Sequence, residues 1–250
     1  DKDNLYKLIM EAGEILLHNG AEIFRVEETM VRISEAYGAH ADVFAVSNGI
    51  FMTLNIEGKV YSTQVKEIPI STIHLERIDQ VNILSTDIEK IIYIIEEALK
   101  ELEEFKEIPY GNKLIRVLFA GLGSAAFSVL FGGGFLDSLA AFIAGSMNYT
   151  FIIYANQRNY PKVLKIVIGS CIATLVSSIL FHIGLGKDLD HIIIGAIITL
   201  VPGVALTTSI RDFFDEDYIS GTIHLVDAIL VAISLSVGVI TVLQIWNIFF

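Results

Sequence analysis

The residues of this chain that could do chemistry are polar groups set inside long apolar segments. Asn148 lies near the middle of one such segment, and Asp137 stands at the start of the same segment. Asp227 lies about one to two turns into the last apolar segment. In a bilayer, polar and ionisable groups are costly unless they are paired or hydrated, and they commonly mark solute or ion pathways.

A second set of polar groups surrounds a proline–glycine pair in the fourth apolar segment. Thr199 precedes Pro202 and Gly203 there. Proline removes a backbone donor and interrupts the helix, and interrupted helices line binding sites in transporters because their free backbone groups can coordinate a solute. A packed kink is the alternative that the sequence leaves open. The polar residues that follow on this segment are Thr207, Thr208, Arg211 and Asp212. Among them, Arg211 is the expected partner of Asp227.

A charged motif lies near an expected helix start in the N-terminal part. Glu22 is followed by Arg25, Glu27 and Glu28. The spacing of three between Glu22, Arg25 and Glu28 favours ion pairs along a solvated helix face. Paired carboxylates could instead do acid–base work, but no nucleophile, metal-binding cluster or glycine-rich phosphate loop accompanies them. The sequence therefore predicts no enzyme, no metal and no cofactor.

Charges are concentrated in the first part of the sequence. Residues 1–108 carry 10 Lys and Arg against 21 Asp and Glu, whereas residues 109–250 carry 7 against 8. The net charge of −12 argues against nucleic-acid binding, which needs clustered basic residues. We therefore expect two domains, a charged one over 1–108 and a hydrophobic one over 109–250.

The pattern within the first domain predicts an α+β fold. Apolar residues at helical spacing predict a helix that stops at His18-Asn19-Gly20 and a second helix that ends at Gly38. Strand-like stretches follow over 42–47, 49–57 and 59–67, with Gly58 at a tight turn. Two further helices are expected over 73–85 and 87–107, before Pro109-Tyr110-Gly111 ends the domain.

The second domain predicts an all-α transmembrane bundle of about five helices. A bilayer span needs roughly 20 mainly apolar residues. The segments that meet this length are 113–131, 135–155, 161–184, 191–210 and 222–250. With the N-terminus in the cytoplasm, six Lys and Arg residues fall on the inner side and one on the outer side. Because basic residues favour the inner side, we expect a cytoplasmic N-terminus and an external C-terminus.

Small residues recur every four positions on two of these segments. They are Ala120, Ser124 and Ser128 on the first, and Gly169, Ala173 and Ser177 on the third. Such rows let helices approach closely in lipid. Packing within the bundle and an interface between copies of the chain in a homo-oligomer are both open interpretations.

Three stretches of this sequence resemble motifs of the threonine/serine exporter family. They are Gly20-Ala21-Glu22 with Arg25-Val26-Glu27-Glu28, Gly133-Gly134-Phe135-Leu136-Asp137, and Val201-Pro202-Gly203 with Arg211-Asp212 and Ser220-Gly221. The matches extend from about residue 13 to residue 230 and so cover most of the chain.

The resemblance implies a secondary transporter in a bacterial or archaeal-type cell membrane. Its substrates would be small hydroxy amino acids or, in some relatives, a dicarboxylate such as succinate, with the proton as coupling ion. In that family a second helical block is either fused to the first or supplied by a separate small membrane protein. Because this sequence contains only the first block, the resemblance implies a small multi-span membrane protein as partner.

The leading hypothesis places a solute with a carboxylate and an amine against the interrupted helix, among the polar groups around the break. Asp227 or Asp137 would carry a proton or pair with the ammonium, and Arg211 would hold the carboxylate. The alternative from another functional class is a membrane-anchored sensor whose acidic domain binds a regulator. A solute-flux assay separates the two.

Overall fold

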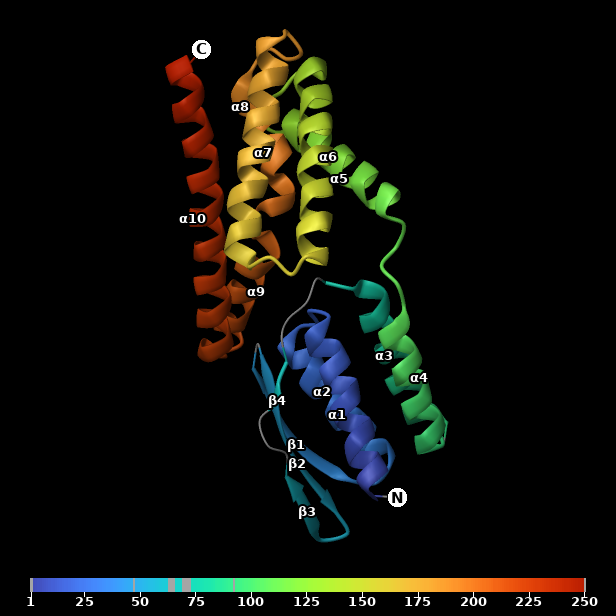
Figure 1. The fold of residues 1–250 in the computed structure, drawn as a ribbon. Coiled ribbons are helices and arrows are strands. Elements are labelled where there is room, and N and C mark those ends of the chain that lie inside the picture. The colour runs from blue at the N-terminus through green and yellow to red at the C-terminus, as the bar shows by residue number, and fades with distance from the viewer. Residues whose placement is uncertain (1, 47, 63–65, 69–72, 92, 250) are drawn as a thin grey trace. The chain divides into compact units, whose positions relative to one another are not determined.

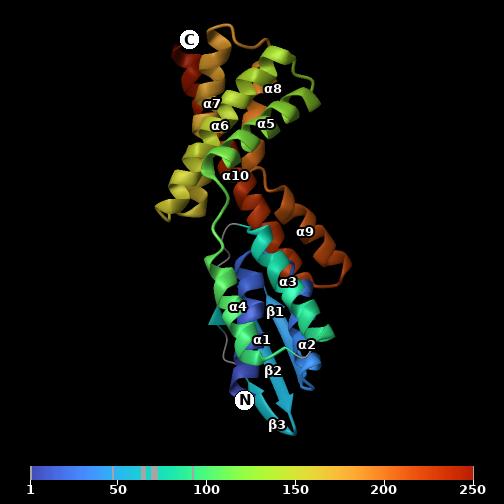
Figure 2. The ribbon, with the colours of Figure 1, turned by 90° about the vertical axis from the view of Figure 1, so that its right-hand side faces the viewer.

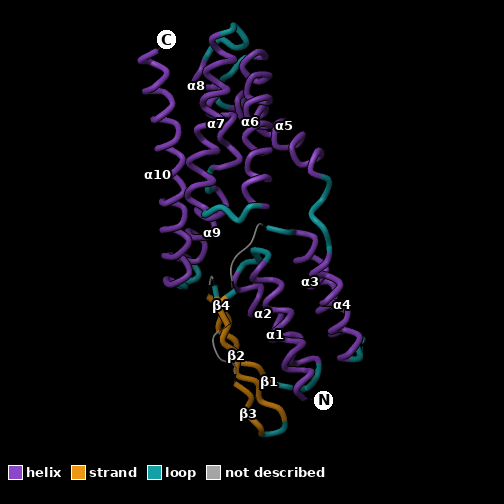
Figure 3. The backbone as a smooth tube through the Cα atoms, viewed as in Figure 1, coloured by secondary structure: helices purple, strands orange, loops and turns teal. Residues whose placement is uncertain are grey.

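The chain folds into two compact units, Asp1–Tyr110 and Gly111–Phe250. The structure is a computed structural model that describes residues 2–46, 48–62, 66–68, 73–91 and 93–249. Figure 1 gives the order of the elements, and Figure 3 shows that helices make up most of the chain. The assignment of the two units to cytoplasm and membrane stays a prediction.

The described part of the N-terminal unit contains four helices and a small sheet. The helices are α1 (Lys2–His18), α2 (Ile23–Ala36), α3 (Leu75–Lys90) and α4 (Ile95–Glu107). The turn after α1 depends on Gly20, whose φ of 81° lies in the left-handed region that favours glycine. The α3 helix begins after His74, whose Nδ1 accepts the backbone N–H of Arg77 at 3.4 Å.

The sheet of this unit is antiparallel and centred on its longest strand. Its strands are β1 (His40–Val46), β2 (Gly49–Ile56), β3 (Lys59–Ser62) and β4 (Lys66–Glu67). The β2 strand pairs with each of the other three, and Val43 lies opposite Met52. Ile50, Met52 and Leu54 of β2 are buried against the helices, whereas the alternate residues face outward.

The expected α+β class is wrong, because the fold is mainly helical and its sheet is small. The stretch 59–67, expected as one strand, forms the four-residue β3 and the two-residue β4. Ser47 and residues 63–65, at or inside the expected strands, lie outside the described residues. Apolar alternation predicts local strand character, but four amphipathic helices provide most of the buried side chains. The break expected at residue 86 lies at Ile91 instead.

The described part of the C-terminal unit consists of helices. They are α5 (Lys113–Leu130), α6 (Phe135–Gln157), α7 (Lys162–His182), α8 (Leu189–Ile197), the 3₁₀ turn η1 (Ile198–Leu200), α9 (Gly203–Phe214) and α10 (Tyr218–Phe249). Four of them, α5, α6, α7 and α10, are long and apolar enough to cross a membrane. A fifth span exists if the bent pair of Leu189–Leu200 and Gly203–Phe214 is one span. Phe250, the expected end of the last span, lies outside the described residues.

Small residues bring these helices close together. A Cβ atom added at Gly145 of α6 would lie 2.0 Å from the Ser124 hydroxyl of α5. One added at Gly195 of α8 would lie 2.5 Å from the backbone oxygen of Ser124. Most of the small residues that recur every four positions on α5 and α7 are buried in the unit: Ser124, Ser128, Gly169, Ala173 and Ser177. These positions therefore pack within the bundle.

The helices α7 and α10 run parallel to each other. Lys162 at the start of α7 contacts Asp227, Cys171 contacts Gly238, and His182 at the end of α7 contacts Trp246. Figures 1 and 2 show α10 alongside α7 and α9 beside the first part of α10. Because two parallel neighbours begin at the same end of the bundle, the chain between them must return along the bundle. The elements α8, η1 and α9 make that return.

Candidate functional site

The backbone is irregular where α8–η1 meets α9 at a bend of 62°. The Val201 N–H bonds to the Ile198 oxygen at 3.2 Å, and the Gly203 N–H bonds to the Val201 oxygen at 2.8 Å. Pro202 has no N–H to donate. Helical bonding resumes where the Leu206 N–H reaches the Pro202 oxygen at 3.0 Å. Backbone groups that leave the regular helical pattern can bind a solute, as in the interrupted helices of transporters.

Asn148 lies beside this break and is fully buried. Its Nδ2 donates to the Ala196 oxygen at 3.3 Å and to the Thr199 hydroxyl oxygen at 3.4 Å. Its Oδ1 is buried and has no hydrogen-bond partner among the described residues. Across from it, a Cβ atom added at Gly169 of α7 would lie 2.8 Å from Oδ1. The structure thus brings Asn148 and Thr199 together and leaves an acceptor unsatisfied between α6, α7 and η1.

Beyond the break, α9 and the start of α10 form a hairpin with polar contacts between its helices. The Ser209 hydroxyl donates to the Gly221 oxygen at 2.8 Å, and both residues are buried. A Cβ atom added at Gly221 would lie 2.8 Å from the Phe213 ring, so glycine permits the close approach. The Asp212 Oδ2 and His224 Nδ1 atoms are 2.8 Å apart.

Asp227 pairs with Lys162, so the expected pairing with Arg211 is wrong. The Lys162 Nζ atom lies 2.6 Å from both carboxylate oxygens of Asp227. Asp227 is on the face of α10 that meets the first turn of α7, whereas Arg211 lies on α9. The sequence could not reveal this contact, because it depends on which helix packs against α10.

Asp137 is enclosed by backbone amides at the start of α6. Its Oδ2 accepts the Gly134 N–H at 2.8 Å, and its Oδ1 accepts the N–H groups of Lys187 at 2.5 Å and Asp188 at 3.0 Å. The side chain is only 3% exposed. It caps α6 and holds the loop between α7 and α8. Its predicted coupling role stays a prediction.

The other predicted residues of α9 lie along the helix after the break. Gly203 begins α9, with open space where a Cβ atom would be. The Thr207 hydroxyl, which is exposed, donates to backbone oxygens of its own helix. Arg211 is partly buried next to Asp212. Of these three, Gly203 is the one at the break itself.

The N-terminal motif makes structural contacts. Glu22 is the N-cap residue of α2, and its Oε2 lies 3.5 Å from the Arg25 Nε atom. The Glu27 Oε1 atom accepts the backbone N–H of Ala45 at 2.8 Å and so joins α2 to β1. The first of these contacts is the ion pair that the spacing predicts.

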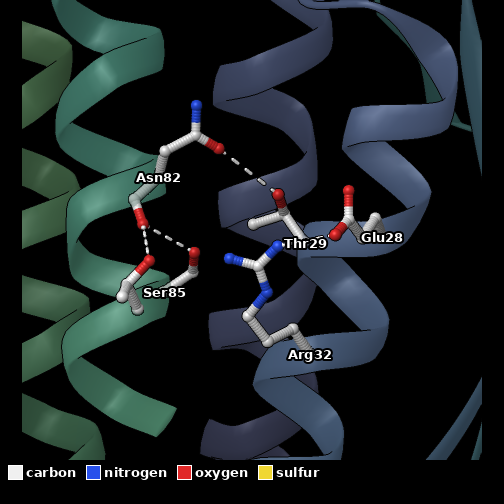
Figure 4. Close-up of polar contacts among 6 residues, drawn as sticks. Glu28, Thr29, Arg32, Asn82 and Ser85 are labelled. Atoms are coloured by element: carbon white, nitrogen blue, oxygen red, sulfur yellow. Dashed lines mark hydrogen bonds and ion pairs between the residues drawn. The ribbon is translucent and has the colours of Figure 1, made fainter. Parts of the chain in front are cut away.

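Glu28 pairs with a residue one turn later rather than with Arg25. Its Oε1 atom lies 2.9 Å from the Arg32 Nη2 atom (Figure 4). The same view shows the Thr29 hydroxyl directed at Asn82 of α3, at 3.5 Å from its Oδ1 atom. These polar contacts lie on α2 and between α2 and α3.

Comparison with known proteins identifies the family. The family described as "Putative threonine/serine exporter" (ThrE) matches residues 7–246. The chain belongs to the threonine/serine exporter family. Members of this family are transporters, which agrees with the prediction that the chain is not an enzyme. With its four or five membrane-capable helices, this exporter-family chain is a multi-pass membrane protein.

Relatives of this exporter-family chain differ in length and in name. A "Threonine/serine exporter" of Corynebacterium glutamicum is 27% identical over 82% of the chain, which spans 44% of that protein. "Probable succinate transporter subunit YjjP" of Klebsiella aerogenes is 22% identical over 96% of the chain and 93% of its own length. The protein of that name from Escherichia coli is 24% identical, with 96% and 94% covered. No solved structure has significant similarity to the chain.

Sequence reasoning about this exporter-family chain missed His224. The predicted set included Asp212 but not the imidazole 2.8 Å from it. A signal was present, because Asp212 lies at the start of the expected break between the fourth and fifth spans (211–221) and His224 lies just after it. Two helices joined by a short connection are antiparallel neighbours, and positions on either side of such a connection meet.

Proposed function

We propose that the chain is a subunit of a secondary transporter that exports threonine or serine, with the solute bound at the break beside Asn148. The observation that carries the proposal is the buried, unsatisfied Oδ1 of Asn148 next to irregular backbone. An unpaired buried acceptor costs about 1–3 kcal/mol. A bound solute that donates a hydrogen bond to Oδ1 offsets that cost. If the break were only a packed kink, the cost would stay uncompensated.

The chemistry around the break favours an amino acid over a dicarboxylate. The groups beside the break are the Asn148 amide, the Thr199 hydroxyl and backbone carbonyls. They include acceptors that suit an ammonium and a hydroxyl group. A dicarboxylate would bring two negative charges, and burying charge without a cationic partner is costly. Arg211 lies about 12 Å beyond Gly203 along α9, too far for a solute held at the break, so we assign it to the substrate carboxylate at the inner mouth of the pathway rather than at the break itself.

Succinate is the second candidate substrate. The two relatives that the chain matches over 93% and 94% of their length are named as succinate transporter subunits. Their lengths also support the proposal that this chain acts as one subunit. Its partner would then be a separate small membrane protein that supplies the second helical block.

The bundle geometry supports five crossings, with the bent pair as one interrupted span. Because α7 and α10 run parallel, α8, η1 and α9 together cross the bundle once. Basic residues then gather at the end where α7 begins, which favours a cytoplasmic N-terminus and an external C-terminus.

If export is coupled to protons, the transporter also needs an ionisable side chain whose protonation changes the position of a helix.

The proposal is tested by efflux of labelled threonine, serine and succinate from membrane vesicles that contain the chain with its partner. In Asn148→Leu, the amide is replaced by an apolar side chain of similar size. We expect threonine and serine efflux to fall about tenfold or more, since a hydrogen bond to a charged group such as the substrate ammonium is worth about 1.5–3 kcal/mol and about 1.4 kcal/mol corresponds to a factor of ten.

Thr150→Val is the matched control, because Thr150 is an exposed residue on the same helix whose hydroxyl bonds to Ser146 of its own helix. Its efflux should stay within about twofold of the unmodified transporter. If the vesicles export succinate but neither threonine nor serine, succinate is the substrate and the amino-acid assignment is wrong. Equal efflux from Asn148→Leu and Thr150→Val would refute the site.

A further inference from the structure

The α9–α10 hairpin holds a histidine–aspartate pair that the proposed binding site does not use. Asp212 is 9% exposed, and its Oδ2 lies 2.8 Å from the Nδ1 of His224. The side chain of His224 is 19% exposed. Around the pair, large apolar side chains such as Ile210, Phe214 and Ile223 point outward. The polar contacts of this hairpin therefore lie between its helices rather than on its outer face.

Contacts with the start of α10 hold α9 in place. Ser209 bonds to the Gly221 oxygen, the Phe213 ring packs on Gly221, and Asp212 meets His224. Each of these joins α9 to the first two turns of α10. Asp212 is nine residues after Gly203, or about 13 Å along the helix axis. A change in this contact can therefore tilt α9 and alter the backbone at the break.

The pair lies among several other charged groups. Asp227, which follows His224 by one turn on α10, is already held by Lys162 of α7. Lys165 of α7 donates to the Asn156 Oδ1 at 2.7 Å. The remaining charged groups on the elements packed against this part of α10 are Arg211 of α9 and Asp215, Glu216 and Asp217 of the turn. Asp212 is the carboxylate in direct contact with the imidazole.

We propose that His224 and Asp212 form a proton-binding pair that sets the position of α9 relative to α10. Imidazole is the side chain that ordinarily changes charge between about pH 5 and 8. With a proton on both ring nitrogens, His224 forms a charge-assisted hydrogen bond to Asp212 and holds α9 against α10. When that proton leaves, the ion pair is lost and the contact weakens. This inference rests on the proposed transport function and names the group that links it to protons.

The test measures efflux from the same vesicles between pH 5 and 8 for the unmodified transporter and for His224→Gln. We expect the unmodified rate to change about fivefold or more across this range and the His224→Gln rate to change less than about twofold. His182→Gln is the control, because His182 lies at the other end of α7 against Trp246. It should keep the full pH dependence.

An exchanged pair separates a role in protonation from a role in folding. Asp212→His combined with His224→Asp keeps one imidazole and one carboxylate in contact, so it should restore the pH dependence that His224→Gln loses. If His224→Gln is as pH-dependent as the unmodified transporter, or if the exchanged pair restores nothing, the inference is overturned.

A distance measurement tests the pair without relying on transport. Spin labels are attached at Val204→Cys of α9 and Val226→Cys of α10, both exposed, in a Cys171→Ser background. We expect the distance distribution to broaden from pH 5 to pH 8, and to be independent of pH in His224→Gln. Vesicles that export none of the three solutes, but show this shift, would refute the proposed function and leave the pair supported. A distance that does not change with pH would refute the pair.

Discussion

Asp137 and Asn148 are both buried polar residues of α6, yet their hydrogen bonding differs. Asp137 accepts three backbone N–H groups, whereas one oxygen of Asn148 accepts none among the described residues. A satisfied buried group stabilises a fold, and an unsatisfied one is a candidate for binding. At the scale of single residues, hydrogen bonding separates an anchor from a site when burial alone does not.

The anchoring role of Asp137 predicts a change in stability rather than in transport. In Asp137→Asn, the charge is lost and an NH₂ group replaces one acceptor oxygen, so at least one of the three amides loses its partner. We expect the free energy of unfolding to fall by about 1–2 kcal/mol. Thermal unfolding in detergent measures this, with Asp190→Asn as the control, because Asp190 is an exposed carboxylate in the first turn of the neighbouring α8. Efflux per folded molecule should be unchanged, and its loss would support the predicted coupling role.

At the scale of elements, close helix contacts hold the bundle together. The tightest of them joins α7 and α10 at Gly238, where an added Cβ atom would lie 1.9 Å from the Ser170 hydroxyl and 2.5 Å from the Val167 oxygen. Backbone oxygen cannot move aside cheaply, so the space at Gly238 is needed for the two helices to pack.

Gly238→Ala should therefore destabilise the bundle. Forcing a methyl group into a packed contact costs about 1–3 kcal/mol. The matched control is Gly123→Ala on α5, where nothing lies within 4 Å of the added Cβ atom. That change should be neutral or stabilising by up to about 1 kcal/mol, since alanine favours the helix. Equal thermal unfolding of the two variants would contradict a close contact between α7 and α10 at Gly238.

At the scale of the whole molecule, the direction of α10 determines the topology. If α8 and α9 formed a re-entrant segment, the chain would come back to the side of the membrane where α7 ends, and α10 would begin there. The contacts of Lys162 with Asp227 and of His182 with Trp246 instead place the start of α10 at the start of α7. The connection between α9 and α10 is therefore expected on the same side of the membrane as the connection between α6 and α7.

Single cysteines introduced into a Cys171→Ser background test this topology. We expect Lys187→Cys to react with a membrane-impermeant maleimide in intact cells. Gln157→Cys and Glu216→Cys, both exposed in the structure, should react only after the membrane is permeabilised. Labelling of Glu216→Cys together with Lys187→Cys in intact cells would indicate a re-entrant segment and four crossings.

Much of the helical bundle and part of the candidate site could be predicted from local sequence. Long apolar runs define the membrane-capable helices because span length is a property of a continuous segment. The bend at Pro202 follows from the missing N–H of proline. The small residues on α5 and α7 indicate close packing for the same local reason. The fold class of the N-terminal unit could not be predicted from local sequence. Alternating apolar and polar residues predict where a strand forms, but they do not show how large a part of the unit the strands make up.

Only the tertiary structure decided which polar groups meet. Asn148 and Thr199 are 51 positions apart, Lys162 and Asp227 are 65 apart, and Asp212 meets His224 across 12 positions. Each pairing depends on which helix faces adjoin, and helix spacing within one segment does not determine that. The sequence by itself established a family of membrane transporters and an interrupted helix. Packing decided that Asn148 keeps an open acceptor, that Asp137 is an anchor, and that Asp212 has a histidine beside it.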